Sequence, residues 1–204
     1  MIIVCGTGNK DKIKEIKRTL LPLLPTVELS PVTDFAPDFD PVEDAETLAG
    51  NALIKARVAA KVSSHWAIAD DTGLFIDALG GAPGVRSARY SGPTATYAAN
   101  RAKALDAMRA VPAPDRTAQF RTVIALVCDR GEFLYEGAVK GRILDRETGD
   151  NGFGYDSLFY CDELGKTFGE AGDDEKNAVS HRGRALAALA NGLKTLAAEY
   201  GATQ

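Results

Sequence analysis

The start of the chain shows two different patterns of apolar residues, one after the other. Residues 1–5, MIIVC, form a short continuous apolar run that predicts a buried strand. In the stretch that follows, apolar side chains recur with helical spacing at Ile13, Ile16, Leu20 and Leu24, and lysines lie between them. The glycines of GTGN separate the two patterns. The start of the chain is therefore predicted to be a strand, a glycine turn and an amphipathic helix.

The rest of the chain continues with further strands and helices. Helices are predicted over 47–62, 94–110 and 182–200. Strands are predicted at AIAD, LFIDAL, FRTVIALVC, FLYEGAVKGRIL and SLFY, with DRG as a hairpin turn between the third and the fourth. Because some strands follow one another without a helix between them, a mixed sheet is favoured over a purely parallel one. We expect an α/β fold over residues 1–204, with one mixed sheet flanked by helices.

Composition and charge narrow the class of protein. The 204 residues are 45% hydrophobic and 25% charged, which is ordinary for a globular domain, and the net charge of -4 argues against nucleic acid as the main partner. No apolar run is long enough to cross a bilayer, and MIIVCGTGNK does not resemble a secretory signal. We therefore expect a cytoplasmic protein that has no membrane partner. Cys5, Cys128 and Cys161 are widely spaced, and this favours buried thiols over a disulfide framework or a zinc site.

The turn Thr7–Lys12, TGNKDK, is a candidate phosphate site. It lies where the first predicted strand leads into the first helix, so backbone N–H groups and the positive end of the helix dipole meet there. Lys10 and Lys12 add positive charge. The turn matches neither the dinucleotide fingerprint nor the GxxxxGK loop. The alternative is that Asn9 only caps the helix and the lysines face water.

Carboxylates gather at two further places. Glu43, Asp44 and Glu46 precede the second predicted helix, and Asp70 and Asp71 close the strand AIADD. Mg²⁺ prefers oxygen ligands and often takes only one or two protein carboxylates together with phosphate oxygens. The two places together would form a metal–phosphate site. Taken alone, Asp44 and Glu46 are better interpreted as acids that face water.

Two stretches near the C-terminus are suited to a flat ligand. In GFGYDSLF, Phe153 lies beside glycines that let a backbone approach closely, and Asp156 follows. In DEKNAVSHRGRAL, charged and imidazole side chains precede an amphipathic helix. Aromatic stacking combined with hydrogen-bond donors is what recognition of a purine requires. The alternative is that Ser180 caps the helix, with His181 and Arg182 on the surface of its first turn.

In combination, these stretches strongly resemble the inosine triphosphate pyrophosphatase family. The resemblance runs from residue 2 to about 190 and rests on TGNKDK, a glutamate eight residues before NALIKA, ADDTGL, GGAPGVRSARYSG, FGYDSLF, GKTFGE and EKNAVSHRG, in this order. It implies an elongated, strongly twisted mixed sheet flanked by helices, two lobes with a nucleotide cleft between them, and usually a homodimer. It also implies Mg²⁺-dependent cleavage of ITP, dITP and XTP between the α- and β-phosphates, which removes deaminated purines from the nucleotide pool.

The resemblance assigns roles to individual residues. Asp71 matches the general base and a metal ligand, and Glu43 matches its partner in holding Mg²⁺. Lys55 matches the cation on the second helix, and Thr72 a substrate contact beside the catalytic acid. Asp70 is expected to face away from Asp71 and to support the site. The other expected substrate-binding residues are Thr7, Gly8, Asn9, Lys10, Asp11 and Lys12 for the phosphates, and Phe153, Gly154, Tyr155, Asp156, Lys176, His181 and Arg182 for the base.

Two departures from the family pattern bear on this site. Thr72 replaces a serine and keeps the hydroxyl. Gly50 lies where relatives commonly have glutamate, and a glycine inside a helix costs about 1 kcal/mol relative to alanine. We therefore ask how firmly Glu43 and Asn51 are held.

The expected reaction follows from these roles. A carboxylate directs a water at the α-phosphorus, while Lys12 and Lys55 neutralise charge on the triphosphate. Arg182 or a nearby backbone N–H would donate to the 6-keto oxygen of hypoxanthine or xanthine, which adenine lacks. Two alternatives stay open, an aspartyl phosphatase that uses an Asp of DDTG as nucleophile and a non-catalytic nucleotide-binding module. The first strand lacks the Asp-x-Asp pattern of those phosphatases.

Overall fold

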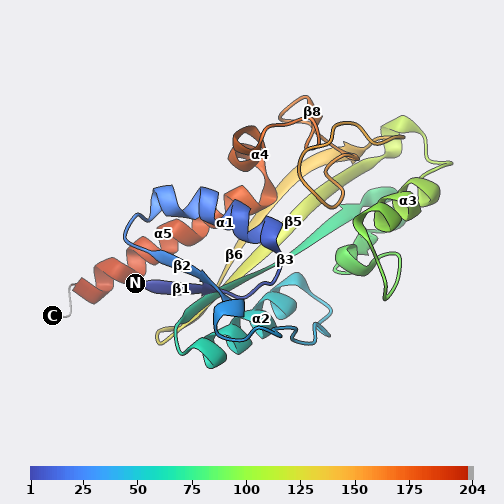
Figure 1. Ribbon diagram of the computed structural model, residues 1–204. Coiled ribbons are helices and arrows are strands. Elements are labelled where there is room, and N and C mark those ends of the chain that lie inside the picture. Colours follow the sequence, from blue (N-terminus) through green and yellow to red (C-terminus); the bar gives the residue numbers. More distant parts are fainter. Residues whose placement is uncertain (202–204) are drawn as a thin grey trace. The chain divides into compact units, whose positions relative to one another are not determined.

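The computed structural model describes residues 1–201, which divide into two compact units (Figure 1). Unit 1 comprises Met1–Asp71, Val123–Glu136 and the chain from Arg182 onward, and unit 2 comprises Thr72–Thr122 and Gly137–His181. Strands β3, β5 and β6 contribute residues to both units. Residues 202–204, the last of the predicted domain, lie outside the described residues.

The described chain forms one mixed sheet with the strand order β2, β1, β3, β5, β6, β7, β8, in which β4 pairs with β3. The pairs β1–β2 and β1–β3 are parallel, and β3–β4, β6–β7 and β7–β8 are antiparallel, so the expected mixed sheet is confirmed. The strands are β1 (Ile2–Cys5), β2 (Glu28–Pro31), β3 (Trp66–Ile76), β4 (Pro83–Gly84), β5 (Thr117–Cys128), β6 (Gly131–Ile143), β7 (Phe159–Cys161) and β8 (Lys166–Thr167). The helices are α1 (Lys10–Leu23), α2 (Leu48–Ser63), α3 (Tyr97–Ala107), α4 (Asp173–Val179) and α5 (His181–Gly201), with short 3-10 turns at Val32–Asp34, Asp77–Leu79, Ser87–Arg89 and Ala113–Asp115. Within residues 1–201, none of the helices has the length and apolar character needed to span a membrane.

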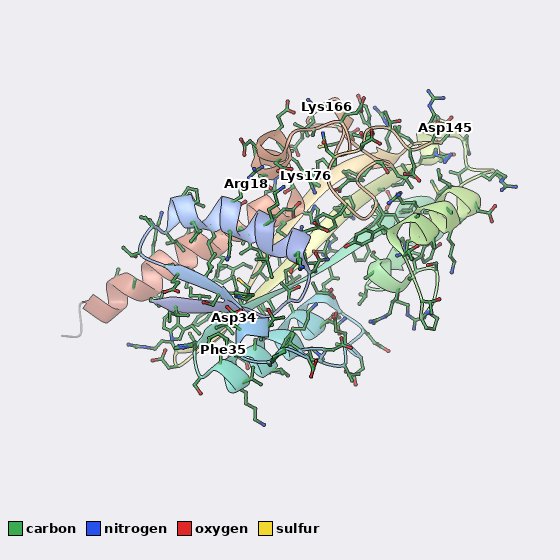
Figure 2. All side chains as sticks on the ribbon, in the orientation of Figure 1. Arg18, Asp34, Phe35, Asp145, Lys166 and Lys176 are labelled. Atoms are coloured by element: carbon green, nitrogen blue, oxygen red, sulfur yellow. The ribbon has the colours of Figure 1, made fainter. Side chains whose placement is uncertain are left out.

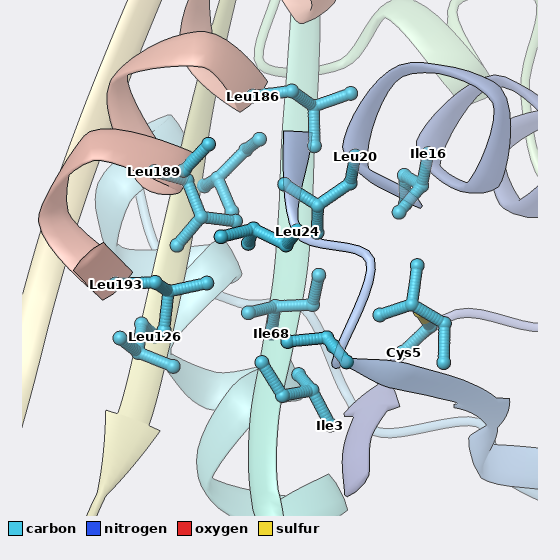
Figure 3. Packing of buried hydrophobic residues seen from close by; sticks show 14 of the residues in the cluster. Ile3, Cys5, Ile16, Leu20, Leu24, Ile68, Leu126, Leu186, Leu189 and Leu193 are labelled. Carbon is cyan, nitrogen blue, oxygen red and sulfur yellow. The ribbon is translucent and has the colours of Figure 1, made fainter. Parts of the chain in front are cut away.

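Helices cover both faces of the strands in unit 1. Figure 1 shows α1 and α5 on one face of β1 and β3, and α2 on the other. Side chains alternate between the faces along each strand. Ile68 joins a core with Leu20 of α1 and Leu189 of α5 (Figure 3), whereas Ala67 and Ala69 pack toward α2. The α2 face of the sheet is lined by small side chains, which lets that helix lie close to β3.

Unit 2 has a core of its own. It combines β3 and β5 residues, such as Leu74 and Phe120, with Met108 after α3 and with Phe159 and Phe168 near the C-terminal strands. The aromatic rings make close contacts, with 4.7 Å between the centroids of Phe120 and Phe159. The phenylalanine-rich packing supports the loops that carry the expected base-binding residues.

The structure corrects several expectations. AIAD and the LFI of LFIDAL belong to the single strand β3, so Asp70 and Asp71 lie in its middle rather than at its end. The predicted strand LFIDAL is wrong in its second half, because Asp77–Leu79 form a 3-10 turn. The strand continues because Gly73 leaves room for β4, since a Cβ there would lie 2.6 Å from the carbonyl oxygen of Gly84. The sequence pattern does not predict α4 or β2, and α3 is shorter than the expected 94–110. Cys5 and Cys161 are buried thiols, as expected, whereas Cys128 is only half-buried.

Candidate functional site

Asp70 and Asp71 project from opposite faces of β3. The residues before them show the same alternation, because Ile68 packs toward α1 and α5 and Ala69 packs toward α2. Asp70 accordingly contacts residues of α1 and α5, and Asp71 contacts residues of α2. The expectation that Asp70 faces away from Asp71 is therefore confirmed, and the two carboxylates belong to two separate clusters within unit 1.

The Asp71 cluster consists of Asp71, Glu43, Asn51 and Lys55. Asn51 and Lys55 lie one turn apart on the same side of α2. Asn51 Nδ2 donates to Asp71 Oδ2 at 3.2 Å, and Lys55 Nζ lies 3.6 Å from Asp71 Oδ1 and 3.1 Å from Glu43 Oε2. The structure thus brings together the three residues to which the sequence assigns metal binding, general base catalysis and the cation on the second helix.

Gly50 allows the loop that carries Glu43 to lie against α2. A Cβ at Gly50 would lie only 2.6 Å from the Cβ of Ala45. Ala45 in turn donates its backbone N–H to Asn51 Oδ1 at 3.0 Å, and Thr47 Oγ1 caps the helix by accepting from Gly50 N at 3.0 Å. The glycine therefore lowers helix propensity but permits the contact that fixes the loop.

The Asp71 carboxyl has the electrostatics of a base. Burial raises its pKa above the ordinary value of 3.8, and the charge of Glu43 raises it further, while Lys55, Lys12 and the hydrogen bond from Asn51 oppose the increase. Carboxylates with raised pKa values are stronger bases than exposed ones and are often found at functional sites. Asp71 is therefore a suitable candidate for orienting or deprotonating a water.

The Asp71 cluster fits a divalent cation that shares its ligands with a phosphate. In the described part of the chain, no group of three or more His, Cys, Asp and Glu side chains is placed to hold a metal ion. Glu43 and Asp71 nevertheless hold one cationic group between them, the ammonium of Lys55. Mg²⁺ commonly takes one or two protein carboxylates and completes its shell with waters and substrate phosphates. The donor set therefore fits Mg²⁺ as a shared ion rather than one enclosed by protein.

The Asp70 cluster consists of Asp70, Lys12, Glu15 and Arg182. Lys12 Nζ lies 3.1 Å from Asp70 Oδ2, and Arg182 donates to the same oxygen from Nε at 3.2 Å and from Nη2 at 3.0 Å. Arg182 Nη1 also donates to Glu15 Oε2. The side chains of Asp70 and Arg182 are 1% and 3% exposed, so this is a buried charge network. The structure therefore places Arg182, expected among the base-binding residues, in an ion pair of unit 1.

The charges in this network stabilise one another. Burial alone would raise the pKa of Asp70, but Lys12 and Arg182 outweigh it and hold that pKa far below its ordinary value of 3.8. Burial lowers the pKa of Lys12, against the opposing charge of Asp70. Burial would likewise lower the pKa of Arg182, but Asp70 and Glu15 raise it. Asp70 is therefore a permanent anion that holds Lys12 and Arg182 in position.

The turn Thr7–Lys12 has the geometry of a capped helix start. Asn9 Oδ1 accepts from Asp11 N at 2.9 Å and from Lys12 N at 3.2 Å, so the capping interpretation of Asn9 is confirmed. Thr7 Oγ1 accepts from Asn9 N at 3.1 Å. Gly8 and the Lys10 side chain are exposed. Phosphate binding by this turn stays a prediction.

Unit 2 brings together three of the expected base-binding residues. Lys176 Nζ lies 2.7 Å from Asp156 Oδ2, and each of these side chains is 5% exposed. The same carboxylate oxygen accepts from Phe153 N at 2.8 Å. The Lys176 ammonium also lies 4.9 Å from the centroid of the Phe153 ring, within the range of a cation–π contact. Lys176 of α4 is labelled in Figure 2, as is the half-buried Lys166 of β8, which pairs with Glu175.

Other contacts of unit 2 hold this group in place. The Tyr155 hydroxyl donates to Ser87 O at 2.9 Å, and Arg101 Nη1 donates to Gly154 O at 3.0 Å, so both inner residues of the turn are anchored. The His181 ring stacks on Phe120 with 4.6 Å between centroids. The hydroxyl of Thr72 contacts that of Thr122.

Several residues of these clusters were not predicted from the sequence. Asn51 is spaced one turn from Lys55 on the predicted helix, and this spacing was a usable signal. Glu15 likewise lies three residues from Lys12 on α1, but its partner Arg182 is 167 residues away and nothing local indicates the pairing. The contacts of Ser87 and Arg101 each involve a backbone carbonyl, since Ser87 O accepts from Tyr155 and Arg101 Nη1 donates to Gly154 O, and no side-chain motif reveals such contacts.

Comparisons with known proteins find similar sequences that match this chain over almost all of its length. The sequence model of the Ham1 family matches residues 3–192. A Geobacter sulfurreducens protein named dITP/XTP pyrophosphatase is 50% identical over 189 residues, which cover 92% of this chain and 94% of that protein. A protein of the same name from Thermus thermophilus is 46% identical, over 95% of this chain and 92% of the relative.

Solved structures of this kind share the fold. The Staphylococcus aureus Ham1 protein superposes with a TM-score of 0.85 at 36% identity, covering 96% of this chain and 99% of that one. A HAM1 protein from Coxiella burnetii gives a TM-score of 0.85 at 40% identity, with the same coverage. The α/β fold with a mixed sheet and flanking helices is therefore confirmed.

Proposed function

The chain belongs to the Ham1 family, and on this premise we propose that it is a dITP/XTP pyrophosphatase. In this proposal it hydrolyses deaminated purine nucleoside triphosphates, dITP, ITP and XTP, to the monophosphate and pyrophosphate with Mg²⁺ as cofactor. The observation that supports it most directly is the Asp71 cluster, in which one cationic group lies between Glu43 and Asp71. A module that only binds nucleotides would not need a buried carboxylate such as Asp71, paired with Glu43 through one cationic group.

Unit 1 carries the phosphate chemistry in this proposal. Glu43 and Asp71 would hold Mg²⁺, which when bound withdraws charge from the phosphate oxygens. Lys55 and Lys12 neutralise negative charge on the triphosphate, the kind of electrostatic stabilisation that dominates phosphoryl transfer. The Asp71 carboxylate would also accept a proton from the attacking water. Asn51 keeps the Asp71 carboxylate oriented through its hydrogen bond to Oδ2.

Unit 2 carries the recognition of the purine. Phe153 offers an aromatic face, and the Lys176 ammonium has three donors, so it can pair with Asp156 and still donate to a 6-keto oxygen. Adenine presents a 6-amino donor at that position, so a donor would face a donor. Because Arg182 is engaged by Asp70 and Glu15, we assign this donor role to Lys176 instead.

A substrate panel tests this function. We expect kcat/KM for dITP and XTP to exceed that for dATP by about 10⁴-fold, a typical discrimination for a site that leaves a buried donor unpaired. Equal turnover of all purine triphosphates would contradict the proposed specificity. Absence of turnover with any of them would favour the binding module, and release of orthophosphate would favour the aspartyl phosphatase.

We also propose that the protein works in the cytoplasm, and that it is a homodimer, as the resemblance to its family implies. Light scattering during size-exclusion chromatography tests the assembly. A mass twice that of the 21.6 kDa chain is expected. A mass equal to that of the single chain would contradict it.

A further inference from the structure

The ammonium of Lys55 occupies the place between the two carboxylates that are expected to bind the metal. Its Nζ lies 3.1 Å from Glu43 Oε2 and 3.6 Å from Asp71 Oδ1. We propose that Lys55 competes with the metal ion for Glu43 and Asp71, so that the chain binds a divalent cation weakly until a triphosphate provides another partner for Lys55. This inference deepens the proposed function, but its test does not require catalysis.

Burial makes the competition strong. The side chains of Lys55 and Asp71 are 8% and 10% exposed, and that of Glu43 is 30% exposed. A divalent cation placed between these carboxylates would lie beside the Lys55 ammonium, and like charges at such a distance repel one another. If Lys55 moved away instead, a buried ammonium would lose both partners, which is costly. In both cases, a divalent cation without nucleotide binds more weakly than it would to the same two carboxylates without the lysine.

A triphosphate removes this penalty. Its oxygens can accept hydrogen bonds from the Lys55 ammonium. The lysine then exchanges its ion pairs with the two carboxylates for ion pairs with the phosphates. The two carboxylates are then available to a metal ion that the same phosphates bind. The structure keeps Asp71 oriented during this exchange, because Asn51 holds Oδ2 at 3.2 Å while Lys55 contacts Oδ1. Metal and nucleotide therefore enter as one complex.

Binding of Mn²⁺ in the absence of nucleotide tests the proposal. Electron paramagnetic resonance of Mn²⁺ gives the dissociation constant for the unaltered chain and for Lys55→Met. We expect Lys55→Met to bind Mn²⁺ at least about tenfold more tightly, which corresponds to about 1.4 kcal/mol. Equal or weaker binding by Lys55→Met would overturn the proposal.

Three further variants serve as controls. Lys61→Met removes the same charge from an exposed position of α2, and it should leave Mn²⁺ affinity unchanged. Lys55→Arg keeps the charge and should bind Mn²⁺ as weakly as the unaltered chain. If Lys55→Met does not fold, Lys55→Gln retains a donor for the carboxylates and should show the same gain in affinity. A gain in Lys61→Met equal to that in Lys55→Met would contradict direct competition.

The unaltered chain offers an independent readout. NMR of lysine ammonium groups reports whether the ion pairs of Lys55 with Glu43 and Asp71 persist. The Lys55 signal is identified as the one that is lost in Lys55→Arg. We expect the signal to move whenever Mg²⁺ binds, because the lysine either leaves the carboxylates or comes to lie beside the cation. Metal binding with an unmoved Lys55 signal would contradict the proposal. If Lys55 competes with the metal ion but the chain releases no pyrophosphate from dITP, the proposed function is refuted and the competition is not.

Discussion

Asp70 and Asp71 are adjacent in β3, yet Asp70 binds Lys12 and Arg182 while Asp71 binds Asn51 and Lys55. The alternation of side chains along a strand separates two acids that would otherwise repel one another. One carboxylate has a pKa held far below its ordinary value by two cations, and burial raises the pKa of the other. We therefore assign a structural role to Asp70 and a chemical role to Asp71.

Asp71→Asn tests the chemical role. The amide is close in size and cannot act as a base, so we expect kcat for dITP to fall at least about 100-fold. The free energy of unfolding should change little, because an uncharged group replaces a carboxylate that burial disfavours. Asp38→Asn, at an exposed position, serves as the control and should keep its activity. Near-normal turnover by Asp71→Asn would remove Asp71 from its assigned role.

Asp70→Asn tests the structural role. At pH 7 it leaves Lys12 and Arg182 without their shared anion, and we expect the free energy of unfolding to fall by about 3–5 kcal/mol. Urea unfolding measures this loss. Asp106→Asn removes one member of the exposed Asp106–Arg109 pair and should have no measurable effect. A similarly small effect of Asp70→Asn would contradict the role assigned to the network.

The contribution of Asp70 also predicts a pH dependence. Its pKa in the folded chain is far below the ordinary value of 3.8, so its contribution to stability is complete above that value and decreases as the pH falls below it. The difference in unfolding free energy between the unaltered chain and Asp70→Asn should therefore be smaller at about pH 3 than at pH 7. A difference that grows as the pH falls would contradict this sign.

Lys176→Met tests purine recognition. We expect KM for dITP to rise at least about tenfold with a much smaller effect on kcat, because the lost contact concerns the base and not the phosphorus. Lys166→Met removes a lysine from an exposed pair with Glu175 and should leave both constants unchanged. A fall in kcat at constant KM would show that Lys176 acts on the chemical step instead.

Gly50→Ala tests the loop that carries Glu43. Alanine favours the helix by about 1 kcal/mol, but its Cβ would lie 2.6 Å from that of Ala45 and would displace the loop. We therefore expect kcat/KM to fall while the midpoint of thermal unfolding changes little. A variant with full activity would show that the loop adapts without cost to the site.

Local patterns predicted most of the fold. The run MIIVC, the helical spacing around Ile16 and the small residues of α2 were sufficient for β1, α1 and α2. The continuity of β3 was not predictable, because the acids and Gly73 indicated the end of a strand. The strand continues because it pairs with β4. Leu74 pairs with Gly84, ten positions later in the chain, and Phe75 pairs with Pro83, eight positions later.

The sequence predicted which residues belong to the candidate site better than it predicted which of them contact one another. Alternation along a strand correctly separated Asp70 from Asp71. The resemblance assigned Arg182 to the base-binding residues, and nothing local in the sequence indicates its pairing with Asp70, which lies 112 residues away. The position of Lys55 between Glu43 and Asp71 also depends on three separate segments, so it was visible only in the folded chain.

Hydrolysis of dITP in H₂¹⁸O with Mg²⁺, followed by mass spectrometry of the products, tests the central claim most directly. We expect dIMP and pyrophosphate as products, with the label in dIMP, because the water attacks the α-phosphorus. Formation of dIDP and labelled orthophosphate, or label in pyrophosphate, would contradict it.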